Sequence, residues 1–259
     1  EKGQKIDFSI YEIEGYDYLP WGSGGGIYGI TIRRSSSGVS KKKKPDVAYV
    51  KNCEMSDNGF YTGELINGIM HGKGSYVWES GHTYKGEYKE GLRHGKGILS
   101  YTEKGKVVAE YIGEFKNDYR HGKGVLKDSD SGEELRNGYW KNDKLDGKGS
   151  SLNFDASGKK IIYKGEFKAN EFHGEGRLSW TDKDGEEIVY KGGFKDGKFH
   201  GYGRYIQKDS EQVGEFRNNV PHGRGVWRLF ATNQKLIGIW ENGKLKKDTT
   251  ESFNEEEVN

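Results

Sequence analysis

The sequence predicts an all-β protein in which strands alternate with glycine-containing turns. Three observations support this class. The chain has 41 Gly but only 3 Pro in 259 residues, whereas Gly usually makes up about 7% of a chain. Its apolar side chains are largely rings, with 17 Tyr, 11 Phe and 6 Trp. Rings and glycines also alternate in one phrase that recurs along most of the chain, which indicates regular structure.

Composition and charge exclude several other classes. Collagen needs Gly at every third position together with abundant Pro, and aromatic residues at 13% argue against full disorder. The longest apolar runs are far shorter than the roughly 20 residues of a membrane-spanning helix. A net charge of +2 creates no field that attracts nucleic acid, so we expect no nucleic-acid partner. Cys53 is the only cysteine, which excludes an internal disulfide and fits a reducing, cytoplasmic compartment.

The recurring phrase reads Tyr-x-Gly-Glu-aromatic, then a short polar stretch, then His-Gly-x-Gly. Its starts lie between 22 residues apart (190 to 212) and 27 residues apart (84 to 111). A period of this length is typical of repeat architectures. The copies open at Tyr61, Tyr84, Tyr111, Arg136, Tyr163, Tyr190, Gln212 and Leu236.

Each phrase opens with a predicted strand. Residues two apart share a face, so Tyr84, Gly86 and Tyr88 point one way while Lys85 and Glu87 point the other. A Gly between two rings leaves room for a ring from the neighbouring strand to lie over the backbone. Large residues two and four places after the box extend the aromatic face: Tyr76 and Trp78, Leu99 and Tyr101, Leu178 and Trp180, and Trp227 and Leu229.

The stretch between one box and the next opening Tyr is predicted to be two strands joined by a turn. In the second copy the strands are Ile98 to Thr102 and Val107 to Tyr111, around the turn Glu103-Lys104-Gly105. The fourth copy differs, because Leu152 and Phe154 lie three and five residues after the last Gly of its box. We expect a bulge or a register shift there.

These residues resemble the MORN (membrane occupation and recognition nexus) repeat, from Tyr61 to about Lys246. Seven copies hold the Gly-x-Gly box and six of them its His. The resemblance implies an elongated single-layer antiparallel sheet of about eight MORN-type β-hairpin repeats, extended like a ribbon. The eighth copy lacks the box, as a terminal cap does.

Three segments follow from this organisation. Residues 1–60 form an amino-terminal, strand-containing segment with a basic loop, residues 61–246 the MORN repeat ribbon, and residues 247–259 an acidic tail. The chain begins with Glu1 rather than Met, which is consistent with a processed chain or with part of a longer one.

The repeated histidines invite a metal or catalytic interpretation, which we do not favour. His71, His94, His121, His173, His200 and His222 occupy the same box. One repeat apart means about 9 to 10 Å, too far to share one ion. We expect each His to form a turn by bonding backbone groups beside the Gly, and we find no role for His82. We expect no metal and no cofactor.

Catalysis is not expected either. The repeated carboxylates Glu64, Glu87, Glu114, Glu166 and Glu215 lie on the polar face, where Lys85 or Lys164 would pair with them. Gly24 to Gly29 fits G-x-G-x-x-G, but no helical period follows it. Walker A and Gly-x-Ser-x-Gly motifs are absent, and a single-layer sheet offers no enclosed pocket. We therefore predict that the protein is not an enzyme.

Two surfaces are candidates for binding. The first is a dense basic block of +6 over twelve residues, which is either a solvated loop or a contact for an acidic partner or anionic lipid. It consists of Arg33, Arg34, Lys41, Lys42, Lys43 and Lys44. The second is a groove on the aromatic face that accepts an amphipathic helix of a partner. It consists of Tyr76, Trp78, Tyr101, Trp180 and Trp227. Residues 1–60, with Ile6, Phe8, Ile10, Ile30 and Ile32, could cover that face instead.

The resulting functional expectation is a non-enzymatic scaffold that joins other structural proteins, with its oligomeric state open. The resemblance implies a cytoplasmic setting in a ciliary axoneme, as for radial-spoke members of the family, or in another cytoskeletal complex. The alternative is a peripheral membrane tether that binds anionic lipids or phosphoinositides. A third interpretation is a regulatory module of a larger enzyme, although lipid-kinase and methyltransferase members carry additional sequence.

Overall fold

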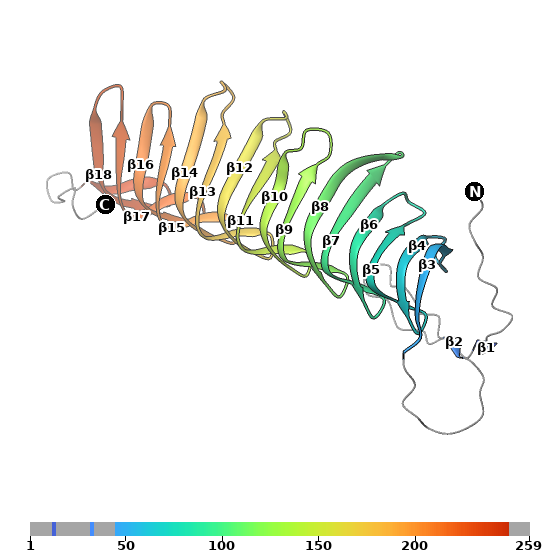
Figure 1. Cartoon of the computed structure of the whole chain (residues 1–259). Coiled ribbons are helices and arrows are strands. Elements are labelled where there is room, and N and C mark those ends of the chain that lie inside the picture. Colours follow the sequence, from blue (N-terminus) through green and yellow to red (C-terminus); the bar gives the residue numbers. More distant parts are fainter. Residues whose placement is uncertain (1–11, 14–31, 34–44, 249–259) are drawn as a thin grey trace. The chain divides into compact units, whose positions relative to one another are not determined.

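The computed structural model describes residues 12–13, 32–33 and 45–248. This part of the chain contains strands and no helix (Figure 1), which confirms the all-β class. The strands are β1 (Glu12–Ile13), β2 (Ile32–Arg33), β3 (Val47–Glu54), β4 (Phe60–Ile66), β5 (Ile69–Val77), β6 (Thr83–Lys89), β7 (Leu92–Glu103), β8 (Lys106–Lys116), β9 (Tyr119–Asp128), β10 (Glu134–Lys141), β11 (Lys144–Phe154), β12 (Lys160–Lys168), β13 (Glu171–Thr181), β14 (Glu187–Lys195), β15 (Lys198–Gln207), β16 (Ser210–Arg217), β17 (Val220–Leu229), β18 (Gln234–Glu241) and β19 (Lys244–Asp248).

The chain divides into two compact units, one of residues 1–133 with 141–143 and one of residues 134–140 with 144–259. In the first unit, β3 to β9 pair antiparallel in chain order. In the second unit, β11 to β19 do the same. Among the described strands β3 pairs with β4 alone and β19 with β18 alone, so each sheet is open. The predicted single-layer antiparallel sheet of hairpin repeats is confirmed.

Two-residue turns join the two strands of each repeat. Asn67 and Gly68 have φ of 51° and 79°, the pair of positive values that a type I′ hairpin turn requires. The equivalent pairs are Glu90–Gly91, Asn117–Asp118, Asn142–Asp143, Ala169–Asn170, Asp196–Gly197, Asn218–Asn219 and Asn242–Gly243. The turn predicted between β7 and β8 is also present, at Lys104 and Gly105.

The opening Tyr of a repeat packs across a pair of glycines. Gly86 of β6 and Gly97 of β7 lie opposite each other. A Cβ added to Gly97 would be 2.4 Å from the Tyr84 hydroxyl oxygen, and one added to Gly86 would be equally close. The Tyr84 hydroxyl donates a hydrogen bond to the carbonyl oxygen of Glu87, at 3.0 Å. The glycines therefore make room for a ring, as predicted, but one ring covers both its own strand and the neighbouring one.

The His-Gly-x-Gly box lies within a strand and not in a turn, which corrects the sequence interpretation. Gly86 lies opposite Gly97, whereas the next residue, Glu87, lies opposite His94. Two box residues, Gly95 and Lys96, therefore have no partner on β6, and Gly95 has a φ of +61°. An insertion of this kind is a β-bulge, which bends the strand.

The bulge or register shift predicted after Gly149 in the fourth repeat does not occur between β11 and β12. The ladder of β11 with β12 runs without interruption from Gly147 to Phe154, and Gly149 lies opposite Gly165. Ser151, at 3% exposure, takes the buried position that a large residue holds in other repeats. Arg136 replaces the opening Tyr, and its guanidinium donates to Leu152 O at 3.0 Å and to Asn153 Oδ1 at 2.7 Å. The long Arg136 side chain thus occurs together with the small Ser151, and the register of β11 with β12 is kept.

The contact between ring and glycine predicts a steric effect of a single methyl group. Gly97→Ala should lower the free energy of unfolding by about 1 to 3 kcal/mol, because the added Cβ displaces the Tyr84 ring from a fully packed site. Urea denaturation measures the change.

The control is Gly105→Asn in the β7–β8 turn. Nothing lies within 4 Å of a Cβ there, and Asn tolerates positive φ, so the urea midpoint should change little. Equal midpoints for the wild type and Gly97→Ala would contradict the proposed packing of the ring.

Candidate functional site

The aromatic face of the first unit carries a cluster around Trp78. Tyr76 is fully buried, and its hydroxyl donates to Asp57 Oδ1. The half-buried Trp78 ring lies against it, with centroids 4.9 Å apart. The Arg93 guanidinium lies 5.7 Å from the Trp78 centroid, within the range of a cation–π contact. Tyr76 is therefore a packing residue that leaves no surface for a partner, whereas Trp78 remains accessible.

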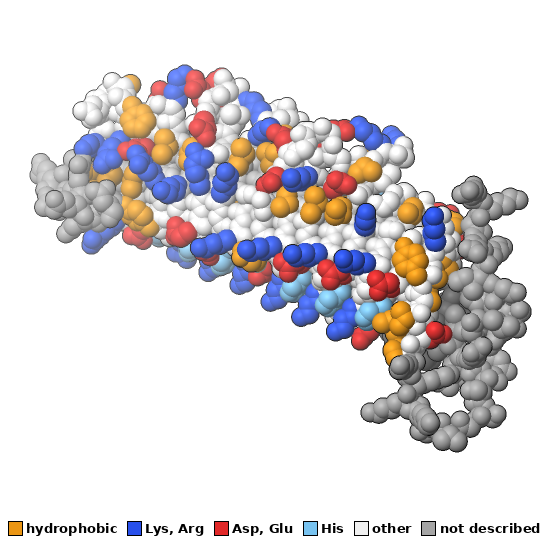
Figure 2. Space-filling model, in the orientation of Figure 1, with side chains coloured by type: hydrophobic (Ala, Val, Ile, Leu, Met, Phe, Trp, Pro, Cys, Tyr) orange, Lys and Arg blue, Asp and Glu red, His pale blue; other side chains and the backbone are white. Residues whose placement is uncertain are grey.

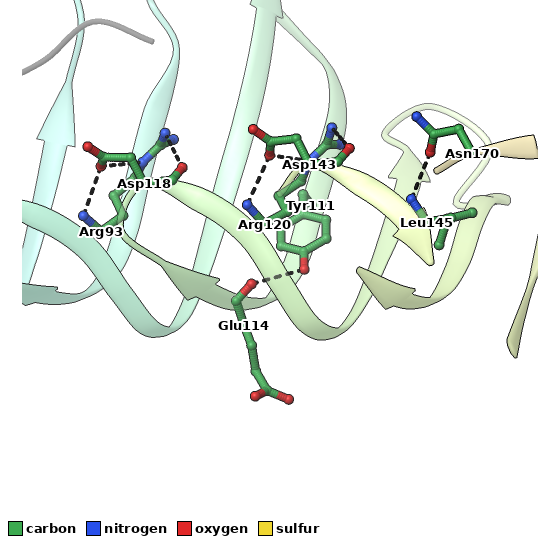
Figure 3. Close-up of polar contacts among 8 residues, drawn as sticks. All are labelled: Arg93, Tyr111, Glu114, Asp118, Arg120, Asp143, Leu145 and Asn170. Atoms are coloured by element: carbon green, nitrogen blue, oxygen red, sulfur yellow. Dashed lines mark hydrogen bonds and ion pairs between the residues drawn. The ribbon is translucent and has the colours of Figure 1, made fainter. Parts of the chain in front are cut away.

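Arg93 is held in place by a clamp between repeats (Figure 3). The Asp118 N–H donates to Arg93 O at 3.0 Å, and the Arg93 N–H donates to Asp118 Oδ1 at 2.9 Å. Arg93 Nε and Nη2 add bonds to Asp118 Oδ1 and Asp118 O, at 3.2 and 2.7 Å. Asp118 is the second residue of a hairpin turn, and its turn is thereby tied to the preceding repeat.

The same clamp recurs one repeat further on, between Arg120 and Asp143 (Figure 3). Asn170 forms two of these bonds with Leu145: the Asn170 N–H donates to Leu145 O at 2.8 Å, and the Leu145 N–H donates to Asn170 Oδ1 at 2.7 Å. Where the second turn residue is Gly, as at Gly91, only the backbone bond remains, here to Met70 O at 2.9 Å. Sequence reasoning missed these contacts, although Asp or Asn as the second residue of several turns was a signal for them.

Tyr101 lies near the second clamp. Burial raises the pKa of its hydroxyl; the Arg120 charge opposes that rise and the Asp143 carboxylate adds to it. The His82 ring lies 5.9 Å from the Tyr101 ring, and His82 Nδ1 accepts a hydrogen bond from the Thr102 N–H at 2.9 Å. His82, which had no role in the sequence interpretation, therefore helps to fix the strand that carries Tyr101.

The second unit carries two aromatic clusters of its own. Trp180 is half-buried, with its ring 6.4 Å from Phe199 and 6.0 Å from Tyr205. Trp227 lies 5.9 Å from the buried Trp240. Each cluster presents partly exposed rings on the face that also holds the buried tyrosines. Their role in a groove stays a prediction.

The repeated Glu and His residues serve the bulge. Glu87 Oε1 accepts a hydrogen bond from the Lys96 N–H at 3.0 Å, and its carboxylate covers Gly95. Across the strands Glu87 faces Lys73, whereas Lys85, one of the lysines expected to pair with these carboxylates, faces Ser75 and Ile98. His94 Nδ1 is buried and has no hydrogen-bond partner among the described residues, so the expected bond to the backbone is not formed. Figure 2 shows His side chains at the surface beside basic and acidic side chains.

In the part of the chain that the structure describes, no group of three or more His, Cys, Asp or Glu side chains is placed to hold a metal ion. The basic block lies outside the described residues, except for Arg33, whose backbone belongs to β2. Ile6, Phe8, Ile10 and Ile30 lie outside them as well, whereas the backbone of Ile32 belongs to β2. Of the acidic tail, residues 249–259 lie outside the described residues. In residues 45–248 no helix is long and apolar enough to cross a membrane.

This geometry is that of a repeat protein whose rings pack on paired glycines. The family model of the MORN repeat matches residues 61–83, 84–105, 111–133, 137–151, 163–185, 190–211 and 213–229. These matches cover more than half of the chain, which therefore belongs to the MORN-repeat family. No curated protein matches the chain.

The clamp predicts coupling between Arg93 and Asp118. Asp118→Gly keeps the positive φ of the turn but removes the side-chain bonds, so it should cost about 1 to 2 kcal/mol of unfolding free energy. Arg93→Met should lose the two guanidinium bonds, of which the one from Nε to Asp118 Oδ1 is also lost in Asp118→Gly. The double variant reproduces the natural Met70–Gly91 pair, and its loss should be clearly smaller than the sum of the two single losses.

Thermal and urea unfolding of the four proteins give this double-mutant cycle. Strictly additive losses would show that the side chains act independently and that the clamp is only a backbone contact.

Proposed function

We propose that the protein is a non-enzymatic scaffold whose MORN-repeat sheet mediates assembly with other proteins. The single observation that supports this most strongly is the pair of aromatic clusters around Trp78 and Trp180. Both Trp rings remain half-buried on a sheet with one layer, and no helix of the described chain covers them. Rings left in this state are candidates for contact with a partner.

The proposed partner contact is an amphipathic helix whose apolar anchors fill the spaces between these rings. In the first unit the contact residues are Trp78 and Tyr101, flanked by Arg93 and Arg120, whose charges are held by aspartates. In the second unit they are Trp180 and Trp227. Tyr76 supports Trp78 from below and does not itself make contact. Large rings in rigid surroundings are the residues that dominate binding energy in protein interfaces.

The proposed setting is the cytoplasm, in a ciliary axoneme or a comparable cytoskeletal complex. This setting rests on the family alone, since members of the MORN family include radial-spoke components of cilia and organisers of protist cytoskeletons. Retention of the protein in a detergent-insoluble cytoskeletal fraction supports the setting, and release together with membranes opposes it.

The scaffold proposal predicts separate effects on binding and folding. Replacing Trp78, Trp180 and Trp227 together by Ala should reduce partner recovery from cell extracts by at least about tenfold, as loss of central aromatic anchors does. Strand content measured by circular dichroism should stay unchanged, because the opening tyrosines still pack on their glycines.

A matched control is Phe60→Ala, which removes a ring with 45% exposure from the opposite face of the first unit. Its partner recovery should equal that of the wild type. Unchanged recovery with the triple Trp variant would exclude the aromatic clusters as the contact.

The second candidate function is a peripheral membrane tether, favoured by the charge of Arg33, Arg34 and Lys41 to Lys44. Each basic residue near an anionic surface contributes about 1 kcal/mol. Replacement of the four lysines by Glu should abolish salt-sensitive flotation with phosphatidylserine vesicles. Flotation that survives this change would show that any membrane contact lies elsewhere.

A further inference from the structure

The outer face of the second unit, opposite the buried tyrosines, carries four exposed cations on four successive strands. Lys164 of β12 lies opposite Arg177 of β13, Arg177 opposite Lys191 of β14, and Lys191 opposite Arg204 of β15. All four side chains are exposed. We call these four residues the basic row.

The basic row is not required by the repeat. In the first unit, the positions beside the glycine pairs hold Ile98, Ile112 and Val125, which lie opposite one another in the same way. Like charges that face each other across strands destabilise a sheet. The second unit therefore keeps an arrangement that its fold would form more readily without the charges.

Only half of the basic row is neutralised within the chain. Arg177 pairs with Glu187 at 3.3 Å, and Arg204 pairs with Glu211 at 2.5 Å. Glu211 is nearly buried and also pairs with Arg228 at 2.7 Å. Burial favours its protonated form, but the hydrogen bonds and charges of the two arginines outweigh this and lower its pKa. Lys164 and Lys191 form no ion pair with any described residue, so their charges are available.

An apolar row runs beside the basic row on the same face. Leu152 lies opposite Ile162, and Val189 lies opposite Ile206, with Ser179 between the two pairs. Ile162 is 37% exposed. Ile162, Ser179, Val189 and Ile206 are each two residues from the basic row along their strands, which corresponds to about 7 Å. The outer face is thus amphipathic over β12 to β15.

We propose that this face binds an acidic amphipathic helix of a partner protein, lying across the strands. Neighbouring strands are about 4.8 Å apart, and one helical turn rises 5.4 Å. Acidic side chains one turn apart would therefore meet successive strands, with those two turns apart reaching Lys164 and Lys191. Apolar side chains next to this acidic stripe would cover Ile162 and Val189.

The surroundings of the basic row favour a helix over an anionic membrane. Glu166 and Glu175 lie on the same face, two residues from Lys164 and Arg177 on the side away from the apolar row. A flat bilayer would press these carboxylates against its own negative charges. A helix is about 10 Å wide, so it can contact the basic and apolar rows and leave both carboxylates in water.

The test uses the full chain and a labelled synthetic helix of about twenty residues. The helix carries one Glu per turn on one stripe and Leu on the adjacent stripe, and the control peptide has the same composition in scrambled order. Fluorescence anisotropy should show salt-sensitive binding of the helix and at least tenfold weaker binding of the scrambled peptide. Lys164→Gln with Lys191→Gln should weaken helix binding at least tenfold, and Ile162→Gln should weaken it as well.

Two controls separate this contact from general attraction and from misfolding. Lys85→Gln changes a lysine whose cross-strand neighbours are Ser75 and Ile98, and binding should stay unchanged. The double lysine variant should melt at the wild-type temperature or above, because it removes repulsion. Equal weakening by Lys85→Gln would overturn the proposal. So would lysine-dependent binding to phosphatidylserine vesicles without binding of the helix. The aromatic clusters of the proposed scaffold lie on the other face, so failure here leaves that proposal standing.

Discussion

The packing of one tyrosine ring over two glycines is the constraint on which the rest of the fold depends. A sheet with a single layer has no second layer to bury its apolar face, so its core must come from its own side chains. Tyr84 achieves this by lying over Gly86 and Gly97. Its ring centroid is 5.1 Å from that of Phe115 and 5.2 Å from that of Tyr88, and both ring pairs are T-shaped. The bulge at the box then bends the strand around these rings.

Alternation along the sequence could predict which residues form this core, but not where the backbone bulges. The spacing of Tyr84, Gly86 and Tyr88 assigns the three residues to one face whatever the neighbours do. The bulge depends on the φ of Gly95 and on which residues face each other, and neither is visible in composition. The prediction for the fourth repeat fails for the same reason, because the register follows the pairing of Gly149 with Gly165 and not the positions of Leu152 and Phe154.

The candidate site was predictable in the same partial way. Trp78 and Tyr76 share a spacing pattern. Only the packing shows that Tyr76 is buried and that Trp78 lies against it. The Asp118 clamp was not predicted, because Asp is common in turns for local reasons and its partner Arg93 lies 25 residues away. The basic row could not be predicted, because Lys164 and Arg177 are separated in the sequence and face each other only across β12 and β13.

The clamp also makes the contacts between successive repeats differ in strength. Positive φ at the second turn residue admits Asp, Asn or Gly, but only Asp and Asn bring a side-chain acceptor, as at Asp118, while Gly91 and Gly197 do not. The contacts between repeats at these glycines are therefore weaker than the contacts at Asp118 or Asp143. Under mechanical load the strands of each unit would separate first at the contacts that end in Gly. The residue at one turn position per repeat therefore decides where such a sheet opens.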